Sequence, residues 1–306
     1  MHIKDLYNNK PVISLEIFPP KQTSPIDTIY ETIDGLKDLK PDFISVTYGA
    51  GGSSREHTVE IANILKNKYN VETLAHLTCY NSTSIEIENI LRKLKQHNVE
   101  NVLALRGDIP NDDNNTISAS QFKHASDLVK HIKSYDNFCI GGACYPEGHI
   151  ECTSKIHDLK YLKAKVDNGL DFLITQIFFD NEMLYDFLER LDILGIKIPI
   201  SAGIMPVINK KQIQRITQMC GTKLTQKFQR IIGKYEHNPE ALKEAGIIYA
   251  TEQIIDLLSS GIDGIHLYTM NKPEVALKIF SNISNIRSTL TKDSKVLRWY
   301  FLRGKL

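Results

Sequence analysis

Short apolar segments rich in β-branched residues alternate with longer amphipathic segments along almost the whole chain. This alternation is typical of repeated βα units, in which a parallel sheet is buried beneath helices. Eight of the apolar segments have the length of a barrel strand. These predicted strands cover residues 12–18, 43–47, 72–77, 101–105, 138–144, 172–179, 198–203 and 264–268.

The segments between the predicted strands carry apolar residues at three- and four-residue spacing, which predicts helices. Eight βα units match a TIM (β/α)8 barrel, whereas an open doubly wound sheet of this length would use fewer strands. We therefore expect the barrel. Residues 212–260, before the last strand, hold more helical sequence than one unit needs, with breaks at Gly221, Gly233 and Asn238-Pro239. They predict one or two extra helices between strands seven and eight. The other predicted helices cover residues 26–39, 55–69, 84–97, 122–134, 154–168, 181–194 and 210–219.

The 306 residues are interpreted as a single α/β domain, because no linker, repeat or low-complexity segment divides them. We expect one catalytic barrel over residues 1–306, with a short tail at about 292–306. The tail holds the only tryptophan, Trp299, and is expected to dock on the barrel or on another subunit. A polar run at 111–115 predicts a loop after the fourth strand.

Lysine and arginine (37) nearly balance aspartate and glutamate (36), which leaves a net charge of +1. No overall field would therefore hold the chain on nucleic acid or on an anionic membrane, and a small-molecule partner is favoured. The apolar runs are too short to span a bilayer and the first residues lack a signal-peptide pattern, so we expect a cytoplasmic protein. The five cysteines form no Cys-x-x-Cys pair, which argues against a disulfide framework or a zinc site, and we expect no metal.

An acidic residue, Glu16, lies near the carboxyl end of the first predicted strand. Active sites of TIM barrels lie at this end of the strands. Alternation along the strand places Glu16 on the face opposite Ile13, Leu15 and Ile17, and a lone acid inside a barrel is costly. Glu16 is therefore either paired with a lysine or arginine from a neighbouring strand or used in catalysis.

Three further strand ends carry polar residues. Arg106-Gly107-Asp108 follows the fourth strand and offers a cation, a flexible hinge and a second acid, although an Arg–Asp pair within the turn has the same sequence. Gln176, in the sixth strand, needs hydrogen-bond partners from either the core or a ligand. His76, near the end of the third strand, is by itself more typical of a core histidine than of a ligand.

Two loops that follow strands have the composition of a cofactor site. The glycine-rich run 48–54 opens a helix, where main-chain amides bind phosphate, but it lacks the third glycine of a dinucleotide fingerprint and the lysine of a P-loop. A capped turn explains it equally well. After the fifth strand, residues 145–149 lead into a helix whose Asp158, Tyr161 and Lys165 are spaced to share one face, as a solvated charged face would be.

Taken together, six motifs resemble, in order and spacing, those of the flavoprotein methylenetetrahydrofolate reductases, in the short bacterial form. The resemblance runs from about residue 13 to residue 276. The motifs are Ser14-Leu15-Glu16-Ile17-Phe18-Pro19-Pro20, Ser45-Val46-Thr47-Tyr48-Gly49-Ala50-Gly51-Gly52, Ala75-His76-Leu77-Thr78-Cys79, Leu105-Arg106-Gly107-Asp108, Tyr145-Pro146-Glu147-Gly148-His149 and Thr175-Gln176-Ile177-Phe178-Phe179-Asp180.

The resemblance implies an oxidoreductase that converts 5,10-methylenetetrahydrofolate to 5-methyltetrahydrofolate with NADH or NADPH, in one-carbon metabolism and methionine biosynthesis. Hydride would pass through FAD in a ping-pong reaction, and the protein would form a homo-oligomer. Glu16 matches the acid that protonates the folate. Asp108 matches the acid beside the flavin pyrimidine, which stabilises the cationic folate, and Gln176 matches a glutamine that contacts both folate and nicotinamide. Gln212 and Lys272 match further folate contacts. FAD contacts would fall on Thr47, Tyr48, Ala50, His76, Arg106, Gly107, Asp108, Ala125, Tyr145, His149, Asp158 and Lys165.

Three positions depart from the family pattern. Tyr161 stands where asparagine is expected and Ala164 where arginine is expected, which implies altered contacts with the phosphate or adenosine of FAD. Lys272 replaces an arginine that would pair with the glutamate tail of the folate. The lysine keeps the charge but loses the bidentate fork, so it implies weaker folate binding.

Three alternatives stay open at the level of sequence. A flavin-free barrel enzyme, such as a lyase or aldolase using Glu16 and Lys165, would be colourless. A non-catalytic scaffold would be favoured if the acids had been lost, but Glu16, Asp108 and Gln176 are all present. A third variant keeps the folate chemistry and takes its electrons from a ferredoxin or a partner flavoprotein.

Overall fold

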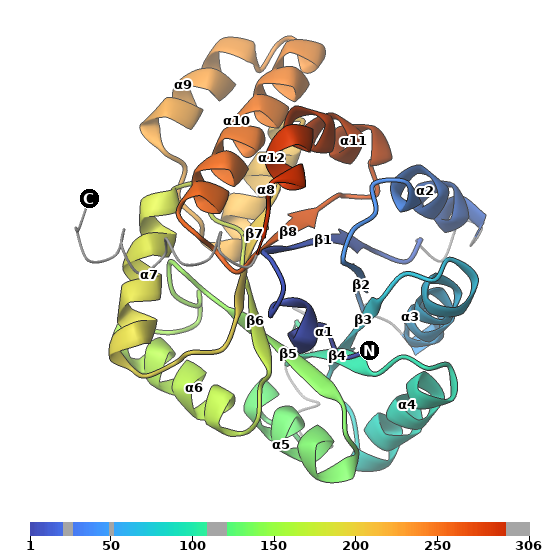
Figure 1. Ribbon diagram of the computed structural model, residues 1–306. Helices are drawn as coiled ribbons and strands as arrows, with labels where there is room; N and C mark the ends of the chain where they lie inside the picture. The colour runs from blue at the N-terminus through green and yellow to red at the C-terminus, as the bar shows by residue number, and fades with distance from the viewer. Residues whose placement is uncertain (21–26, 49–51, 109–120, 292–306) are drawn as a thin grey trace.

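Eight parallel strands close into a barrel in the order β1 to β8, surrounded by helices (Figure 1). This closed parallel barrel confirms the expected TIM barrel. The structure is a computed structural model that describes residues 1–20, 27–48, 52–108 and 121–291. The strands are β1 Val12–Ile17, β2 Phe43–Val46, β3 Thr73–Thr78, β4 Asn101–Leu105, β5 Cys139–Cys144, β6 Phe172–Thr175, β7 Ile200–Ile204 and β8 Gly264–Tyr268.

Most helices lie within a few residues of their predicted positions, because capping residues in the sequence mark several of their ends. Thr83 and Glu86 form a capping box at the start of α4, and Asn238 caps the start of α10. The helices are α1 Ile3–Leu6, α2 Asp27–Lys37, α3 Gly52–Asn63, α4 Ser84–Gln96, α5 Ala125–Tyr135, α6 Lys155–Asp167, α7 Asn181–Ile193, α8 Lys210–Cys220, α9 Gln226–Tyr235, α10 Pro239–Ser259, α11 Pro273–Asn282 and α12 Ser284–Ser288.

Three helices, α8, α9 and α10, lie between β7 and β8, as the excess of helical sequence predicts. Gly221 ends α8 in the left-handed conformation, with φ at 67°, and Asn238-Pro239 opens α10. Gly233 does not interrupt a helix, because it lies inside α9. Since α10 packs on the barrel strands, α8 and α9 are the additional pair.

Two expectations need correction, and one element was not expected. The sixth strand ends at Thr175 rather than at residue 179, so Gln176 lies just beyond it. The helix after β2 changes at Ile64–Lys68 into a π-helical turn. The short helix α1 was not predicted, because four residues carry too little periodicity. The expected loop at 111–115 and the tail at 292–306 with Trp299 lie outside the described residues.

The lower half of the barrel interior, at the amino ends of the strands, is filled by apolar side chains and closed by α1. Tyr7, just after α1, donates or accepts a 2.8 Å hydrogen bond with Ser201, and its ring lies 5.7 Å from that of Phe172. Asn101 accepts a 2.8 Å hydrogen bond from the amide of Ile3, which ties α1 to β4. The packed floor leaves only the carboxyl-terminal end of the barrel for polar chemistry. The apolar side chains are Ile3, Tyr7, Val12, Phe43, Leu74, Leu103, Cys139, Phe172 and Ile174.

The pairing register sets which residues face one another above this floor. Ser14 lies opposite His266, and Glu16 lies opposite Ser45 on one side and Tyr268 on the other. The neighbouring residues Ile13, Leu15 and Ile17 turn outward into the core between the barrel and the helices. The predicted alternation along the first strand is thereby confirmed.

Candidate active site

Glu16 projects into the barrel interior from the end of β1, and its side chain is 17% exposed. Two histidines face its carboxyl group: Nε2 of His76 on β3 and Nε2 of His266 on β8 each lie 3.5 Å from Glu16 Oε2. Within the described residues, no lysine or arginine forms an ion pair with Glu16. The alternative of a lysine or arginine partner on a neighbouring strand is therefore not found in the part of the chain that the structure describes, and the acid lies between two imidazoles.

His76 is almost fully buried, and burial lowers its pKa from 6.5 to about 4 despite the nearby carboxyl group. The ring is therefore neutral at pH 7. Over the described part of the chain, its Nε2 atom has no hydrogen-bond partner, although Glu16 lies 3.5 Å away. A buried nitrogen without a partner favours a ligand over a purely structural histidine.

Tyr268 crosses the upper end of the barrel. Its hydroxyl donates a 2.9 Å hydrogen bond to the carbonyl oxygen of Thr175, and its ring lies against the α-carbon of Gly203. Burial raises the pKa of Tyr268 well above its ordinary value, so the ring is neutral. Tyr268 therefore lines the candidate site beside Glu16.

The loops after β1 and β8 are clamped together next to Glu16. The hydroxyl of Thr269 donates a 2.6 Å hydrogen bond to the carbonyl oxygen of Glu16. The side chain of Asn271 accepts from the amide of Phe18 at 3.1 Å and donates to its carbonyl oxygen at 2.8 Å. Lys272 follows this clamp as the exposed N-cap residue of α11.

Arg106 lies beyond β4 and binds the carboxylate of Glu151 through both terminal nitrogens, at 2.6 and 2.7 Å. This hydrogen bonding lowers the pKa of Glu151. Gly107 has φ at 92°, a left-handed conformation that turns the chain towards the exposed Asp108. The alternative of an Arg106–Asp108 pair within the turn is not what the structure shows.

A second group of expected site residues joins the loop after β5 to α6. The rings of Tyr145 and His149 meet edge to face at 4.6 Å, and the amide of His149 donates to Asp158 at 3.3 Å. Lys165 donates a 2.5 Å hydrogen bond to the carbonyl oxygen of Ala143. Burial lowers the pKa of Lys165 and raises that of Asp158, so both charges are held in a partly desolvated setting.

Tyr161 does not lie in the same environment as Asp158 and Lys165, although the helical spacing predicts one common face for the three residues. Its side chain is 69% exposed, and Ala164 is exposed as well. Asp158 and Lys165 turn toward the barrel, so the expected common face is only partly formed. The two positions that depart from the family pattern both lie on the open side of α6.

Gln176 and Gln212, the two glutamines expected to contact folate, differ in the backbone amides that their side-chain oxygens bind. Gln176 is half-buried just after β6, and its side-chain oxygen accepts from the amide of Ile177 at 2.9 Å. Gln212 folds back on the segment before α8, where its oxygen accepts from the amide of Ile208 at 3.0 Å. Its amide nitrogen donates to the carbonyl oxygen of Pro206 at 3.4 Å, so Gln212 stabilises its own loop and has one N–H left for a ligand.

The remaining expected contacts lie at the same end of the barrel. Thr47 and Tyr48 follow β2 and are half-buried, and Ala125 is the first residue of α5. Ala50 lies outside the described residues. Thr47 is held by the hydroxyl of Thr58, which donates to its carbonyl oxygen at 2.9 Å.

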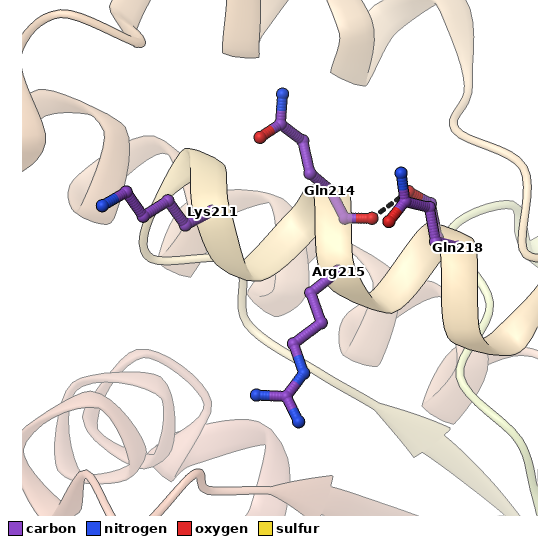
Figure 2. Close-up of a pocket in the computed structure, with 5 residues that line it drawn as sticks. Lys211, Gln214, Arg215 and Gln218 are labelled. Atoms are coloured by element: carbon purple, nitrogen blue, oxygen red, sulfur yellow. Dashed lines mark hydrogen bonds between the residues drawn. The ribbon is translucent and has the colours of Figure 1, made fainter. Parts of the chain in front are cut away.

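A shallow hollow of about 500 Å³ lies elsewhere, along α8 (Figure 2). Its lining residues all come from this one helix, and Figure 2 shows Lys211, Gln214 and Arg215 pointing in different directions. Side chains that diverge cannot converge on one ligand, so this hollow is not the candidate site. The polar groups that do converge are those around Glu16.

A family model described as methylenetetrahydrofolate reductase matches residues 2–284. The chain belongs to the methylenetetrahydrofolate reductase family. The 5,10-methylenetetrahydrofolate reductase of Escherichia coli is 35% identical over 267 residues, covering 87% of this chain and 88% of that protein. A probable methylenetetrahydrofolate reductase (NADH) of rice is 38% identical over 304 residues and covers 95% of this chain.

The chain spans about half the length of the plant and fission-yeast members of the family that it matches. Among solved structures, an uncharacterized Clostridium thermocellum protein described as binding two copies of 5-methyl-5,6,7,8-tetrahydrofolic acid has a TM-score of 0.64. It is 15% identical, and the match covers 93% of this chain and 98% of that one. At this identity the likeness supports the fold alone.

Four residues that contact the candidate site side chains were not predicted from the sequence: His266, Ser45, Tyr268 and Glu151. Two of them could have been found from the alternation along the last strand. His266 and Tyr268 alternate with Ile265 and Leu267, which face outward, so they face the barrel interior. Glu151 carries no comparable signal, since it lies in an irregular loop 45 residues from Arg106. Within the described residues, no cluster of three metal-ligating side chains occurs and no helix has the length and hydropathy of a membrane span.

Proposed function

We propose that this chain is a flavin-dependent reductase that converts 5,10-methylenetetrahydrofolate to 5-methyltetrahydrofolate with NADH or NADPH. The observation that carries the proposal is the position of Glu16, a carboxyl group at the catalytic end of a barrel strand without a lysine or arginine partner among the described residues. Such a group can hold a proton for a substrate. Family membership supplies the substrate class.

The residues expected to hold FAD fit a polar, anionic ligand. His76 offers a buried nitrogen without a hydrogen-bond partner in the described chain, and Lys165 offers a partly buried ammonium bound to one carbonyl oxygen. Arg106 adds a guanidinium at the same end of the barrel, and its terminal nitrogens would exchange Glu151 for FAD. Bound here, FAD would supply the hydride chemistry, accepting a hydride from the nicotinamide and returning it to the folate.

Glu16 acts in this proposal as the general acid. Its proton moves to N10 of the folate, the bond between N10 and the bridging carbon breaks, and the electron pair of that bond stays on N10. The bridging carbon becomes a 5-iminium cation, which accepts the hydride as the 5-methyl group forms. Solvent then returns a proton to Glu16 through its exposed edge.

The other residues bind and orient the substrate. Asp108, on the exposed turn after Gly107, would stabilise the folate cation where positive charge develops. Gln176, at the end of β6, would contact folate and nicotinamide in turn. Lys272 would attract the glutamate tail of the folate as a point charge, and Gln212 would offer its amide nitrogen.

The wider setting follows from the same proposal. The reaction would serve one-carbon metabolism and methionine biosynthesis in the cytoplasm, and the protein would act as a homo-oligomer. Tyr161 and Ala164 lie on the open side of α6, where they would leave the adenosine end of FAD with fewer polar contacts. We expect that a looser hold on FAD accompanies these two residues.

An absorbance spectrum followed by anaerobic titration tests the proposal. The purified chain should be yellow, should bleach when NADH or NADPH is added, and should regain its colour when 5,10-methylenetetrahydrofolate follows. A colourless protein that binds no added FAD would overturn the proposal in favour of the lyase or aldolase alternative. A yellow protein bleached only by a reduced ferredoxin or flavoprotein would replace the nicotinamide donor.

A further inference from the structure

His266 lies directly beneath the carboxyl group of Glu16 and is fully buried. It projects inward from β8 opposite Ser14 on β1. Its Nδ1 atom lies 2.8 Å from the hydroxyl of Ser14, and its Nε2 atom lies 3.4 Å from the hydroxyl of Ser45 and 3.5 Å from Glu16 Oε2. The ring therefore touches three polar groups, and only one of them is an acid.

The two contacts of the Ser14 hydroxyl favour one tautomer of His266. The single hydroxyl proton of Ser14 is donated to the carbonyl oxygen of Ile265, at 3.2 Å. With its proton used there, the hydroxyl oxygen accepts from the imidazole, and we assign a proton to Nδ1 of His266. In the neutral ring, Nε2 is left as an acceptor that points at Ser45 and Glu16.

An acceptor nitrogen opposite a carboxylate would place two lone pairs against each other. The contact between His266 and Glu16 is favourable only when one proton lies between them, either on the carboxyl oxygen or on Nε2. The carboxylic acid paired with a neutral ring avoids separating two charges in a buried site. With His266 in this tautomer, a hydrogen bond between the two residues has the carboxyl group of Glu16 as its donor.

The other titratable groups that face Glu16 do not compete for this proton. His76 on β3 lies at the same distance but makes no hydrogen bond to the carboxyl group, and burial lowers its pKa to about 4. Tyr268 on β8 stays neutral because burial raises its pKa. From β2, the side chain facing Glu16 in the pairing register is Ser45, which does not titrate.

We propose that His266 is a positioning residue for Glu16: held by Ser14, it presents an acceptor nitrogen that orients the carboxyl group for proton donation to folate. This inference rests on the proposed proton transfer. His266 itself does not touch the substrate in this role, because it lies wholly below the surface of the site.

The kinetic test combines His266→Phe and the milder His266→Gln with Glu16→Gln. Each half-reaction is followed by stopped flow: bleaching by NADH and return of colour with 5,10-methylenetetrahydrofolate. We expect the His266 variants to slow the folate step at least tenfold and to change its pH profile, while the NADH step stays within twofold. In the Glu16→Gln background, His266→Phe should slow neither step further.

A matched control removes a histidine that faces a glutamate outside the barrel interior. His131 on α5 lies 3.3 Å from Glu88 on α4, and His131→Leu should leave both half-reactions unchanged. If His266→Phe slows both half-reactions equally, or slows Glu16→Gln as much as it slows the unaltered protein, His266 has only a structural role. A folate step unchanged in both His266 variants, with the protein still folded by circular dichroism, also overturns the inference.

A spectroscopic test needs no activity and so separates this inference from the proposed function. In protein labelled with ¹⁵N-histidine, the His266 signals are assigned by their loss in His266→Gln. We expect a neutral ring protonated at Nδ1, with an Nε2 shift that moves in Glu16→Gln. A ring protonated at Nε2, or an Nε2 signal insensitive to Glu16, would contradict the pairing even if the protein reduces folate.

Discussion

The hydroxyl of Tyr268 on β8 donates a 2.9 Å hydrogen bond to the carbonyl oxygen of Thr175 on β6, and so passes over β7. Only Gly203 on β7 allows this crossing, because a β-carbon there would lie 2.7 Å from the ring of Tyr268 and 2.4 Å from Thr175 O. The position of Tyr268 in the candidate site thus depends on the absence of a side chain at residue 203.

Gly203→Ala tests this dependence. The added methyl group must displace Tyr268 or the backbone of β6, so we expect the free energy of unfolding to fall by about 1–3 kcal/mol. Urea titration followed by circular dichroism measures it. Gly233→Ala is the matched control, since nothing lies within 4 Å of that position and alanine in a helix interior stabilises by about 0.5–1 kcal/mol. Equal stabilities for the two variants would contradict the steric argument.

Glu16→Gln keeps the shape of the side chain and removes its acidic proton. General acid catalysis is worth about 10²–10⁴-fold, so folate reduction should slow by that order while flavin reduction by NADH stays near normal. Stopped-flow absorbance separates the two steps. A parallel loss in both would show that Glu16 supports the site as a whole and does not deliver the proton.

Asp108→Asn removes the negative charge on the turn after Gly107 without changing its size. We expect slower folate reduction and weaker folate binding, because the cation that forms during the reaction loses its counter-charge. Single-turnover rates at several folate concentrations give both quantities. Folate kinetics equal to those of the unaltered protein would remove Asp108 from the mechanism.

His76 should make the stability of the protein depend on pH. In the unfolded chain this histidine takes up a proton below about pH 6.5, whereas burial in the folded state lowers its pKa to about 4. Between these values the unfolded state binds more protons, so the free energy of unfolding rises with pH, by up to about 1.4 kcal/mol per unit, and the contribution is constant above pH 6.5.

His76→Gln isolates this contribution from that of the carboxylates. Urea unfolding of both proteins at intervals from pH 4 to pH 7 should give a shallower pH dependence for the variant. Two parallel curves would mean that His76 titrates alike in the folded and unfolded states, and would contradict its burial in an uncharged form.

Much of the candidate site could be predicted because strand residues alternate between two faces. Alternation along the first strand places Glu16 inside the barrel, and the strand ends place Arg106, Asp108 and Gln176 at the carboxyl-terminal end of the barrel. The identity of the partners could not be predicted. Glu16 and His266 are 250 residues apart, and Arg106 and Glu151 are 45 residues apart.

The sequence by itself determined the eight βα units, the extra helices after β7 and the inward direction of Glu16, because these follow from local periodicity and capping. Only the tertiary structure decided that Glu16 meets two histidines, that Arg106 meets Glu151 and that Gln212 folds onto its own loop. These contacts depend on barrel closure and strand register, which bring distant residues within hydrogen-bond reach.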